Sequence, residues 1–332
     1  MNIRRFLILL GLISLSLLVA ANIGAIPKFL NYLHKIHWYL IPLLILVQLL
    51  SYYCNSQLYR TFFSISGHNV PMRKIFEISI GINFANQTVL ASAIAGTAYL
   101  TNTLKGLVPP GKVTLAQIGR YFFAAGTNIP LLLFGIMLIF FSGSISHISV
   151  RLVVFILVVI ITAGVAGIVY LSDRAHMRRL IRPLINTYNR FGNYFLRKSF
   201  QPLTPVKVGN FLDEFYTGYN DIIRNKRALT KLTIWATGGN LAEIATVYAV
   251  FTGFGSFPNP GIVILAYQIA IAASLIGPIT AGAGALEFGM IGAFTALGQP
   301  FALSLAVVVV YRALSMIIFL PPGFYYYRQG LK

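Results

Sequence analysis

Long apolar runs separated by short polar stretches dominate the amino-acid sequence. A helix needs about 20 consecutive apolar residues to cross the hydrocarbon core of a bilayer. The runs that reach this length cover residues 6–26, 38–59, 113–142, 150–171, 231–254 and 300–320. The pattern therefore predicts an all-α, polytopic helical membrane protein. The first run follows Arg4 and Arg5 and is as long as a span, which favours an uncleaved first helix over a signal peptide.

Two further apolar stretches have an intermediate length. Residues 75–104 and 262–297 are long for one crossing and short for two. Both contain small residues, in the run ASAIAG at 91–96 and in the run GPITAGAGA at 277–285. Small residues permit the close burial that non-helical backbone requires at membrane depth. We therefore expect each stretch to form a re-entrant hairpin, which enters the bilayer and leaves it on the same side.

The positions of the basic residues set the expected orientation. Of the 26 Lys and Arg residues, twelve fall in the segment 172–231. If both hairpins return to the side that they enter, one side holds 21 basic residues, including the twelve of this segment. The other side holds only Lys28, Lys35 and Arg151, and Arg120 and Arg312 lie within spans. The positive-inside rule makes the basic side cytoplasmic. We therefore expect both termini in the cytoplasm and the chain in the cell (cytoplasmic, inner) membrane.

The predicted elements recur along the chain. A shift of 192 residues moves the run 38–59 onto 230–251 and the first hairpin onto 267–296. The same shift moves Gly106, Arg120 and Pro130 onto Gly298, Arg312 and Pro322. Because the first unit begins outside and the second begins inside, we predict an inverted repeat. This architecture is typical of secondary transporters, whose substrate sites lie near the bilayer midplane.

We therefore expect one membrane domain over residues 1–332, built from two half-units. The first half-unit covers about 38–142, the second covers about 231–322, and a basic cytoplasmic insertion at about 172–230 separates them. In the insertion, basic residues alternate with Leu, Ile, Tyr and Phe. Two interpretations remain open for this segment: an amphipathic segment that lies on anionic lipid headgroups, or a solvated basic loop.

Composition and motifs argue against several functions. The chain is 57% hydrophobic and 10% charged, with a mean hydropathy of +0.76, which is typical of membrane proteins. Because the basic residues lie between spans, the net charge of +19 does not indicate nucleic-acid binding. The single cysteine, Cys54, and the scattered histidines predict no metal site and no cofactor. Neither a Walker loop nor an HExxH or nucleophile-elbow motif is present, so we expect no catalytic residues.

Five charged residues lie within apolar stretches. They are Glu77, Glu243, Glu287, Arg120 and Arg312. A charge at the centre of a membrane helix costs roughly 2.5–3.5 kcal/mol on insertion scales, so such residues usually face a partner or a cavity. For Arg312 two compatible interpretations are an ion pair with Glu287 or Glu243, and recognition of a phosphate through two parallel hydrogen bonds.

The other intramembrane charges also have alternative interpretations. Arg120 lies near the start of its helix, which slightly favours an interfacial anchor over a cavity residue. Glu77 follows Arg73 by one turn and is interpreted as a charge at the membrane interface. Glu243 lies beside the small residues of the run GGNLAEIATVY, where it either pairs with Arg312 or lines a cavity.

The second half of the chain resembles a known family. The motif residues are Pro278, Gly282, Gly284 and Glu287, followed by Gly298 and the Tyr311–Arg312 pair. They resemble the family of lysylphosphatidylglycerol synthase transmembrane regions, also called flippase-like domain proteins. Ala281 stands where the family usually has glycine. The run YLTNTLKGLVPPGKVTLAQIGRYFFAAGTN is similar to an earlier block of the family, so the resemblance covers about residues 5–328.

The resemblance implies a membrane domain that moves lipids with charged headgroups between leaflets. It also implies that Glu287 and Arg312 line a headgroup cavity, with Pro278, Gly282, Gly284, Tyr311, Glu243 and Arg120 as further candidate site residues. The chain ends at Lys332, without room for the soluble aminoacyltransferase domain that some family members carry, so lysyl transfer is not expected.

Three functions therefore compete. The first is a flippase-like transporter whose partner is a membrane phospholipid or another lipid with a charged headgroup. The second is a membrane subunit that serves a separate soluble lipid-modifying enzyme. The third is an intramembrane enzyme that acts on lipid-linked substrates, with Glu287 or Glu243 as a general base. The predicted inverted repeat and the intramembrane charges favour the first function. Because the sequence contains no paired carboxylates and no metal-binding constellation, the chain is not expected to be an enzyme.

Overall fold

The computed structural model describes residues 41–88, 92–142, 204–274 and 284–330, together with the single residues Tyr32, Arg179 and Pro183. These residues form helices and no β-strand, which confirms the predicted helical fold class. The helices are α3 (Ile41–Ile65), α4 (Met72–Thr88), α5 (Ser92–Thr103), α6 (Pro110–Ser142), α9 (Pro205–Arg224), α10 (Lys226–Gly253), α11 (Pro260–Ser274), α12 (Ala285–Ala296) and α13 (Phe301–Gly330). The predicted spans at 6–26 and 150–171 lie outside the described residues.

Three of these helices are long and apolar enough to cross a membrane. They are α3, α6 and α13, which match the spans predicted at 38–59, 113–142 and 300–320. The span predicted at 231–254 corresponds to α10, which has 28 residues but is not among these three helices. Its composition explains the difference, because polar residues, among them Asn240 and Glu243, interrupt its apolar sequence.

Each stretch of intermediate length forms a pair of short helices. In the first, α4 packs against α5, and in the second, α11 packs against α12. Both α5 and α12 have 12 residues, which is too few for either to cross a bilayer alone. The interruption of both stretches agrees with the predicted hairpins, whereas the depth and the side at which they enter a membrane remain predictions.

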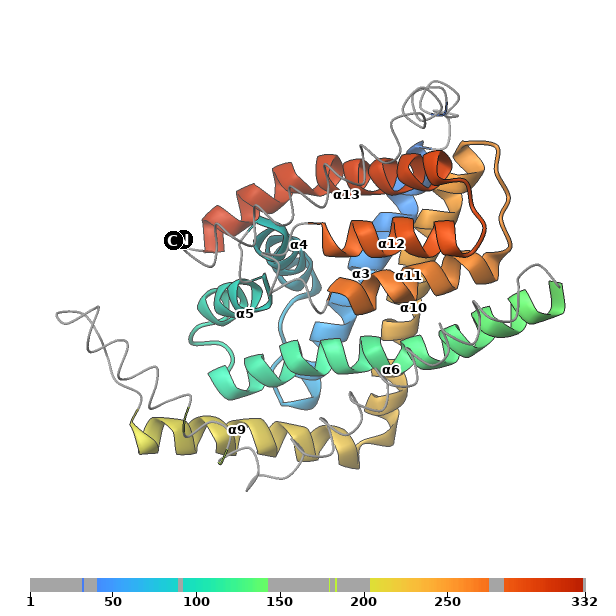
Figure 1. The fold of residues 1–332 in the computed structure, drawn as a ribbon. Coiled ribbons are helices and arrows are strands. Elements are labelled where there is room, and N and C mark those ends of the chain that lie inside the picture. The colour runs from blue at the N-terminus through green and yellow to red at the C-terminus, as the bar shows by residue number, and fades with distance from the viewer. Residues whose placement is uncertain are drawn as a thin grey trace.

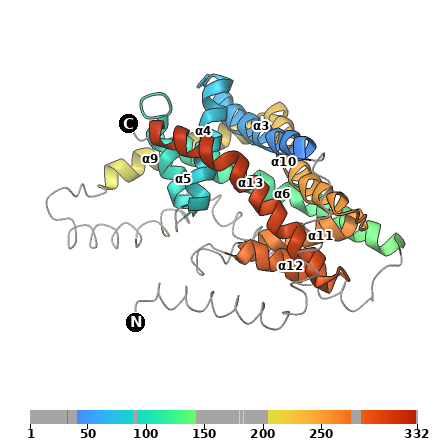
Figure 2. The same ribbon diagram turned by 90° about the horizontal axis from the view of Figure 1, so that it is seen from above.

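The two half-units pack against each other in a reciprocal way (Figure 1). α3 lies along α10, and hydrogen bonds join the two helices in antiparallel register: the Thr246 hydroxyl donates to Gln48, and Ser51 donates to Glu243. The last helix of each half-unit packs against the hairpin of the other, because α6 contacts α11 and α13 contacts α4. Seen from above, α4 again lies against α13 (Figure 2). Such reciprocal contacts, of α6 with α11 and of α13 with α4, are what a two-fold repeat would produce.

The helix α9 holds one end of the first half-unit. It is amphipathic and buries Leu212, Phe215 and Tyr216, and it packs against α6. Its Glu214 accepts a hydrogen bond of 2.9 Å from the backbone N–H of Gly111, in the first turn of α6. A carboxylate there satisfies a backbone donor that has no partner within its own helix. The described end of the insertion that the sequence predicted to be cytoplasmic is therefore a packed helix.

Most buried apolar side chains gather in two large clusters, one for each half-unit, and a small third cluster of Tyr52, Ile80 and Phe319 joins the half-units. One large cluster lies mainly in α10 to α13, and the other lies mainly in α3 to α6 and in α9. Polar side chains are concentrated where the half-units meet, and they include the buried residues Gln48, Ser51 and Asn240. Because buried polar groups need hydrogen-bond partners, this meeting place is the natural position for a site.

Candidate functional site

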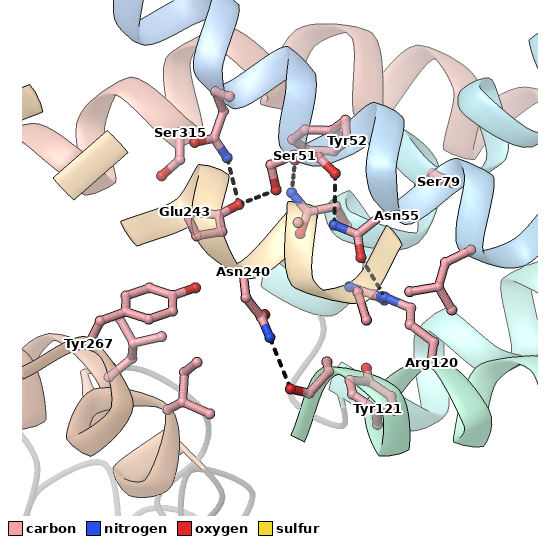
Figure 3. A pocket seen from close by; sticks show the side chains of 18 of the residues that line it. Ser51, Tyr52, Asn55, Ser79, Arg120, Tyr121, Asn240, Glu243, Tyr267 and Ser315 are labelled. Atoms are coloured by element: carbon pink, nitrogen blue, oxygen red, sulfur yellow. Dashed lines mark hydrogen bonds between the residues drawn. The ribbon is translucent and has the colours of Figure 1, made fainter. Parts of the chain in front are cut away.

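A cavity of about 340 Å³ lies between the two half-units, and we call it the central cavity (Figure 3). Its lining comes from α3, α4, α6, α10, α11, α12 and α13. Among the described residues, the charged side chains of the lining are those of Glu243, Arg120 and Arg312. The structure therefore brings together three of the residues that the sequence singled out, from three different helices.

Glu243 is held by neutral donors on two other helices. Its Oε1 accepts hydrogen bonds from Gln48 Nε2 at 3.1 Å and from Ser51 Oγ at 2.6 Å, both on α3. Its Oε2 accepts a hydrogen bond of 2.9 Å from the hydroxyl of Tyr311 on α13. Figure 3 shows Ser51 and Glu243 pointing toward each other across the α3–α10 contact. The carboxylate thus lines the cavity, and no ion pair with Arg312 forms among the described residues.

The position of Glu243 depends on the close approach of α3 to α10. A Cβ atom added at Gly238 would lie 3.1 Å from Cys54 Sγ, and one added at Gly239 would lie 3.7 Å from the Cys54 Cβ. A larger side chain at Gly238 would therefore push α3 away from α10. Because hydrogen bonds weaken steeply with distance, this separation would remove the donors that solvate Glu243.

Arg120 also has neutral partners. Its Nε donates to Asn55 Oδ1 at 3.0 Å, and its Nη1 donates to the Tyr59 hydroxyl at 3.2 Å. Its guanidinium carbon lies 5.7 Å from the centre of the Tyr59 ring and 5.3 Å from that of the Tyr121 ring. Such cation–π contacts stabilise a guanidinium group without neutralising it. Arg120 therefore lines the cavity and brings to it a positive charge that no described carboxylate pairs.

Of the two arginines that line the cavity, Arg312 is the one with a described carboxylate partner. Its Nε donates to Glu287 Oε1, so that α13 and α12 are joined by an ion pair. Glu287 Oε2 is buried and accepts no hydrogen bond in the described part of the chain. Of the two acidic partners considered from the sequence, the structure places Glu287 beside Arg312. Glu287 itself lies behind Arg312 rather than in the lining of the cavity.

Tyrosine side chains complete the polar wall. Tyr311 is buried on α13, and besides Glu243 it has Tyr267 of α11 as a neighbour in the lining. On α3, the Tyr52 hydroxyl accepts a hydrogen bond from Asn83, and the Tyr52 ring stacks on Phe319 with ring centres 3.9 Å apart. Asn240 donates to the Thr127 hydroxyl at 2.8 Å and to the backbone carbonyl oxygen of Ala124 at 2.9 Å.

The remaining predicted residues have different positions. Gly284 precedes α12 in a left-handed conformation, with a φ of 93°, and its carbonyl accepts from the Phe288 N–H. It therefore sets the start of the helix that carries Glu287. Pro278 and Gly282 lie outside the described residues. Glu77 pairs with Arg73 at 3.1 Å, and neither residue lines the cavity.

Several cavity residues were not predicted from the sequence. The clearest are Tyr52, Asn55, Tyr59, Asn240 and Tyr267. On α3 they were detectable, because Gln48, the Ser51–Tyr52 pair, Asn55 and Tyr59 recur at helical spacing within an apolar run. Such a polar stripe indicates a helix face turned toward a cavity or a partner. Tyr267 gave no such signal, because the residues three and four positions away from it, which share its helix face, are apolar.

The charged groups of the site suit the binding of ionic groups. Within the described ranges, no group of three or more His, Cys, Asp or Glu side chains lies close enough to hold a metal ion. Guanidinium groups bind phosphates, and carboxylates bind ammonium groups. The central cavity therefore provides groups for both signs of charge.

Comparison with known proteins identifies the family. No curated protein and no solved structure matches the chain. The family model described as "Lysylphosphatidylglycerol synthase TM region" matches residues 5–323, nearly the whole chain, and confirms the resemblance in the motif residues. The chain therefore belongs to the family of lysylphosphatidylglycerol synthase transmembrane regions, a family of membrane proteins with lipid-related function.

Proposed function

We propose that this protein binds the charged headgroup of a membrane lipid in the central cavity and moves the lipid between the two leaflets. The observation that carries the proposal is that Arg120, Arg312 and Glu243 line one cavity between two half-units. Charges at membrane depth are costly and usually mark a pathway for a substrate or an ion. Membership of a lipid-related membrane family supports a lipid as the substrate.

The partners of the three charges suggest how a headgroup binds. Within the described part of the chain, Arg120 has only neutral hydrogen-bond partners, so its guanidinium can pair with a phosphate. Glu243 is likewise solvated by neutral donors and can pair with an ammonium group. A phospholipid whose headgroup carries both a phosphate and an ammonium group would supply the counter-charge that each residue lacks.

The ion pair between Arg312 and Glu287 supplies an exchangeable contact. While it is intact, Glu287 neutralises Arg312 at the wall of the cavity. A phosphate that enters the cavity competes with Glu287 for the guanidinium, because both bind the same N–H groups. In this proposal the exchange couples headgroup binding to the contact between α12 and α13, and no covalent step takes place.

Movement of the lipid follows from the predicted inverted repeat. In transporters with this architecture, one half-unit rocks against the other around a fixed site. Here the reciprocal contacts of α6 with α11 and of α13 with α4 are the surfaces that would slide. The acyl chains would stay in the bilayer while the headgroup crosses in the cavity, where polar side chains replace water.

The test is a leaflet-accessibility assay in proteoliposomes. Acyl-labelled phosphatidylethanolamine is incorporated in both leaflets, and a membrane-impermeant quencher reports the fraction that reaches the outer leaflet. The protein should accelerate this exchange, and Arg120→Ala and Arg312→Ala should each abolish the acceleration. Arg73→Ala removes an exposed arginine far from the cavity and should leave the rate unchanged. Equal exchange in protein-free vesicles would overturn the proposal.

A further inference from the structure

A second polar hollow lies outside the central cavity, on the surface formed by α3 and α10. Two adjoining hollows of about 430 and 230 Å³ share Arg60, Ser64 and Asn69 in their linings. Lys231 and Trp235 of α10 line the larger of the two. We call this surface the α3–α10 groove. It lies where α3 ends and α10 begins, because the two helices run antiparallel.

The groove is positively charged and has no internal counter-ion. Arg60 and Lys231 line the same hollow, and His68 lines its extension. No carboxylate is found in this lining among the described residues, and neither Arg60 nor Lys231 forms a hydrogen bond or an ion pair with another described residue. Two like charges that share one hollow repel each other, so a bound anion would stabilise this arrangement.

The composition of the walls fits a phosphate group. The side chains of Gln57, Thr61, Ser64 and Asn69 provide hydroxyl and amide groups between the cations. An arginine binds phosphate through parallel N–H donors, and a lysine adds a mobile point charge. The hollow is open to its surroundings, as a site for a group that remains attached to a larger molecule must be.

An apolar surface extends from the groove along both helices. On α3 the exposed side chains Tyr53, Leu50 and Leu46 follow one another at helical spacing, and on α10 Ile234 is exposed beside Trp235. The Tyr53 and Trp235 rings meet edge to face, with centres 5.8 Å apart. Tyrosine and tryptophan are enriched where headgroups meet acyl chains. The groove therefore continues from a cationic end to an apolar face, which matches the two parts of a phospholipid.

We infer that the α3–α10 groove binds an anionic phospholipid of the cytoplasmic leaflet, with its phosphate between Arg60 and Lys231 and its acyl chains along α3 and α10. The cytoplasmic assignment follows from the positive-inside prediction for these basic residues. Cytoplasmic leaflets are rich in anionic lipids, and each Lys or Arg near such a surface adds about 1 kcal/mol of attraction. The site is separate from the central cavity and does not depend on translocation.

Trp235 provides a direct reporter of this site. The chain contains two tryptophans, so Trp38→Phe leaves Trp235 as the single one. This variant is placed in nanodiscs of phosphatidylcholine to which phosphatidylglycerol with brominated acyl chains is added. Bromine quenches tryptophan on contact, so quenching should saturate at a low fraction of the anionic lipid. Brominated phosphatidylcholine at the same fraction should quench much less.

A matched pair of charge variants separates a site from general attraction. Arg60→Ala with Lys231→Ala should raise the half-saturating fraction of brominated phosphatidylglycerol by about thirtyfold, because both phosphate contacts are lost. Lys105→Ala with Arg328→Ala removes the same charge from exposed positions elsewhere and should leave it unchanged. Both altered residues of the groove are exposed, and circular dichroism checks that the helices persist.

Three outcomes would overturn the inference. Equal quenching by brominated phosphatidylcholine would show that the groove does not select anionic lipid. An equal loss in the Lys105 and Arg328 variant would show attraction to the whole basic surface rather than to this groove. Displacement of the lipid by inorganic phosphate, beyond the effect of chloride at the same ionic strength, would indicate a site for free phosphate.

Discussion

Ser51 of α3 donates a hydrogen bond of 2.6 Å to Glu243 of α10, and the two residues are 192 positions apart, which is the offset that relates the half-units. Under two-fold symmetry, a residue contacts its own equivalent only where the symmetry axis passes. The bond therefore indicates a pseudo-two-fold axis between Ser51 and Glu243. Arg120 and Arg312 are equivalent by the same offset and both line the central cavity. The cavity thus lies on the axis, with one arginine from each half-unit.

The two arginines nevertheless have different surroundings. Arg312 pairs with Glu287, whereas Arg120 has only neutral partners. Ala95 occupies the position that corresponds to Glu287 in the first half-unit. The predicted repeat would thus relate the two guanidinium groups of the cavity, and the sequence difference between Ala95 and Glu287 would make one of them more available to an anion.

The charge swap at Arg312 and Glu287 separates stability from binding. Glu287→Arg combined with Arg312→Glu restores an ion pair, so the double variant should be nearly as thermally stable as the native protein. Each single variant should lose about 2 kcal/mol, because a partly buried charge is left without its partner. The double variant should still fail to translocate lipid, since the cation no longer lies in the wall of the cavity. Thermal unfolding in detergent and the leaflet assay test the two parts, and full translocation by the double variant would contradict the role of Arg312.

Glu243 should control which headgroups are accepted. Glu243→Gln keeps an acceptor for Ser51 and Gln48 but removes the negative charge, so the fold should persist. Exchange of phosphatidylethanolamine should then slow relative to that of phosphatidylglycerol, because the ammonium group has lost its partner. Competition between the two acyl-labelled lipids in the same vesicles measures this ratio. An unchanged ratio would show that Glu243 is structural.

Removal of the Glu243 acceptor should also destabilise the helix contact. Glu243→Leu leaves the buried donors Gln48, Ser51 and Tyr311 without an acceptor, and each lost hydrogen bond to a charged group is worth about 2 kcal/mol. We therefore expect a clear fall in the unfolding temperature for Glu243→Leu and a much smaller fall for Glu243→Gln. Equal stability of the two variants would mean that these hydrogen bonds contribute little.

Arg120 should be sensitive to geometry as well as to charge. Arg120→Lys keeps the positive charge. A lysine ammonium group, however, cannot donate to both Asn55 and Tyr59 while it also contacts the Tyr59 and Tyr121 rings. Translocation should fall by about tenfold, which corresponds to the loss of one charge-assisted hydrogen bond. The matched variant is Lys112→Arg, a change of the same kind outside the cavity. A native rate for Arg120→Lys would indicate that a point charge suffices.

Gly284 should matter for its backbone conformation. Gly284→Ala places a Cβ in a left-handed conformation and within 2.7 Å of the Phe288 ring, so it should destabilise the protein by about 1 kcal/mol or more. Gly292→Ala lies in the same helix, where a Cβ meets no atom within 4 Å, and should be neutral or slightly stabilising. Thermal unfolding of the two variants measures the difference, and similar values would contradict this explanation.

The side of each loop tests the predicted inverted repeat. Cys54 is buried and is the single cysteine of the sequence, so its replacement by serine gives a background free of cysteine. New cysteines at Asn69 and Lys105 should react with an impermeant reagent from the same, cytoplasmic side, because the intervening hairpin returns. A cysteine at Phe257, which is 75% exposed, should react only from the opposite side. Reaction of positions 69 and 105 from opposite sides would mean that residues 75–104 cross the membrane.

Much of the fold and part of the site were predictable from sequence. Hydrophobic run lengths predicted α3, α6 and α13 because burial in hydrocarbon forces the backbone to satisfy its own hydrogen bonds, which leaves the helix as the available form. Intermediate lengths predicted that neither stretch forms a single span, and the pairs α4–α5 and α11–α12 agree with this, while their re-entrance into the membrane stays a prediction. The cost of a charge in an apolar helix singled out Arg120, Arg312, Glu243 and Glu287 without any knowledge of their neighbours.

Tertiary structure decided which of these charges meet. From sequence, Arg120 was favoured as an interfacial anchor, and Glu287 and Glu243 were equal candidates for Arg312. The packing of α13 on α12 gave Glu287 to Arg312, and the antiparallel contact of α3 with α10 gave Glu243 to Ser51. A helix sequence fixes which side chains share a face, but the partner across the interface depends on how distant helices approach each other. That approach is set by close-packed side chains along the whole contact, which no local stretch of the sequence contains.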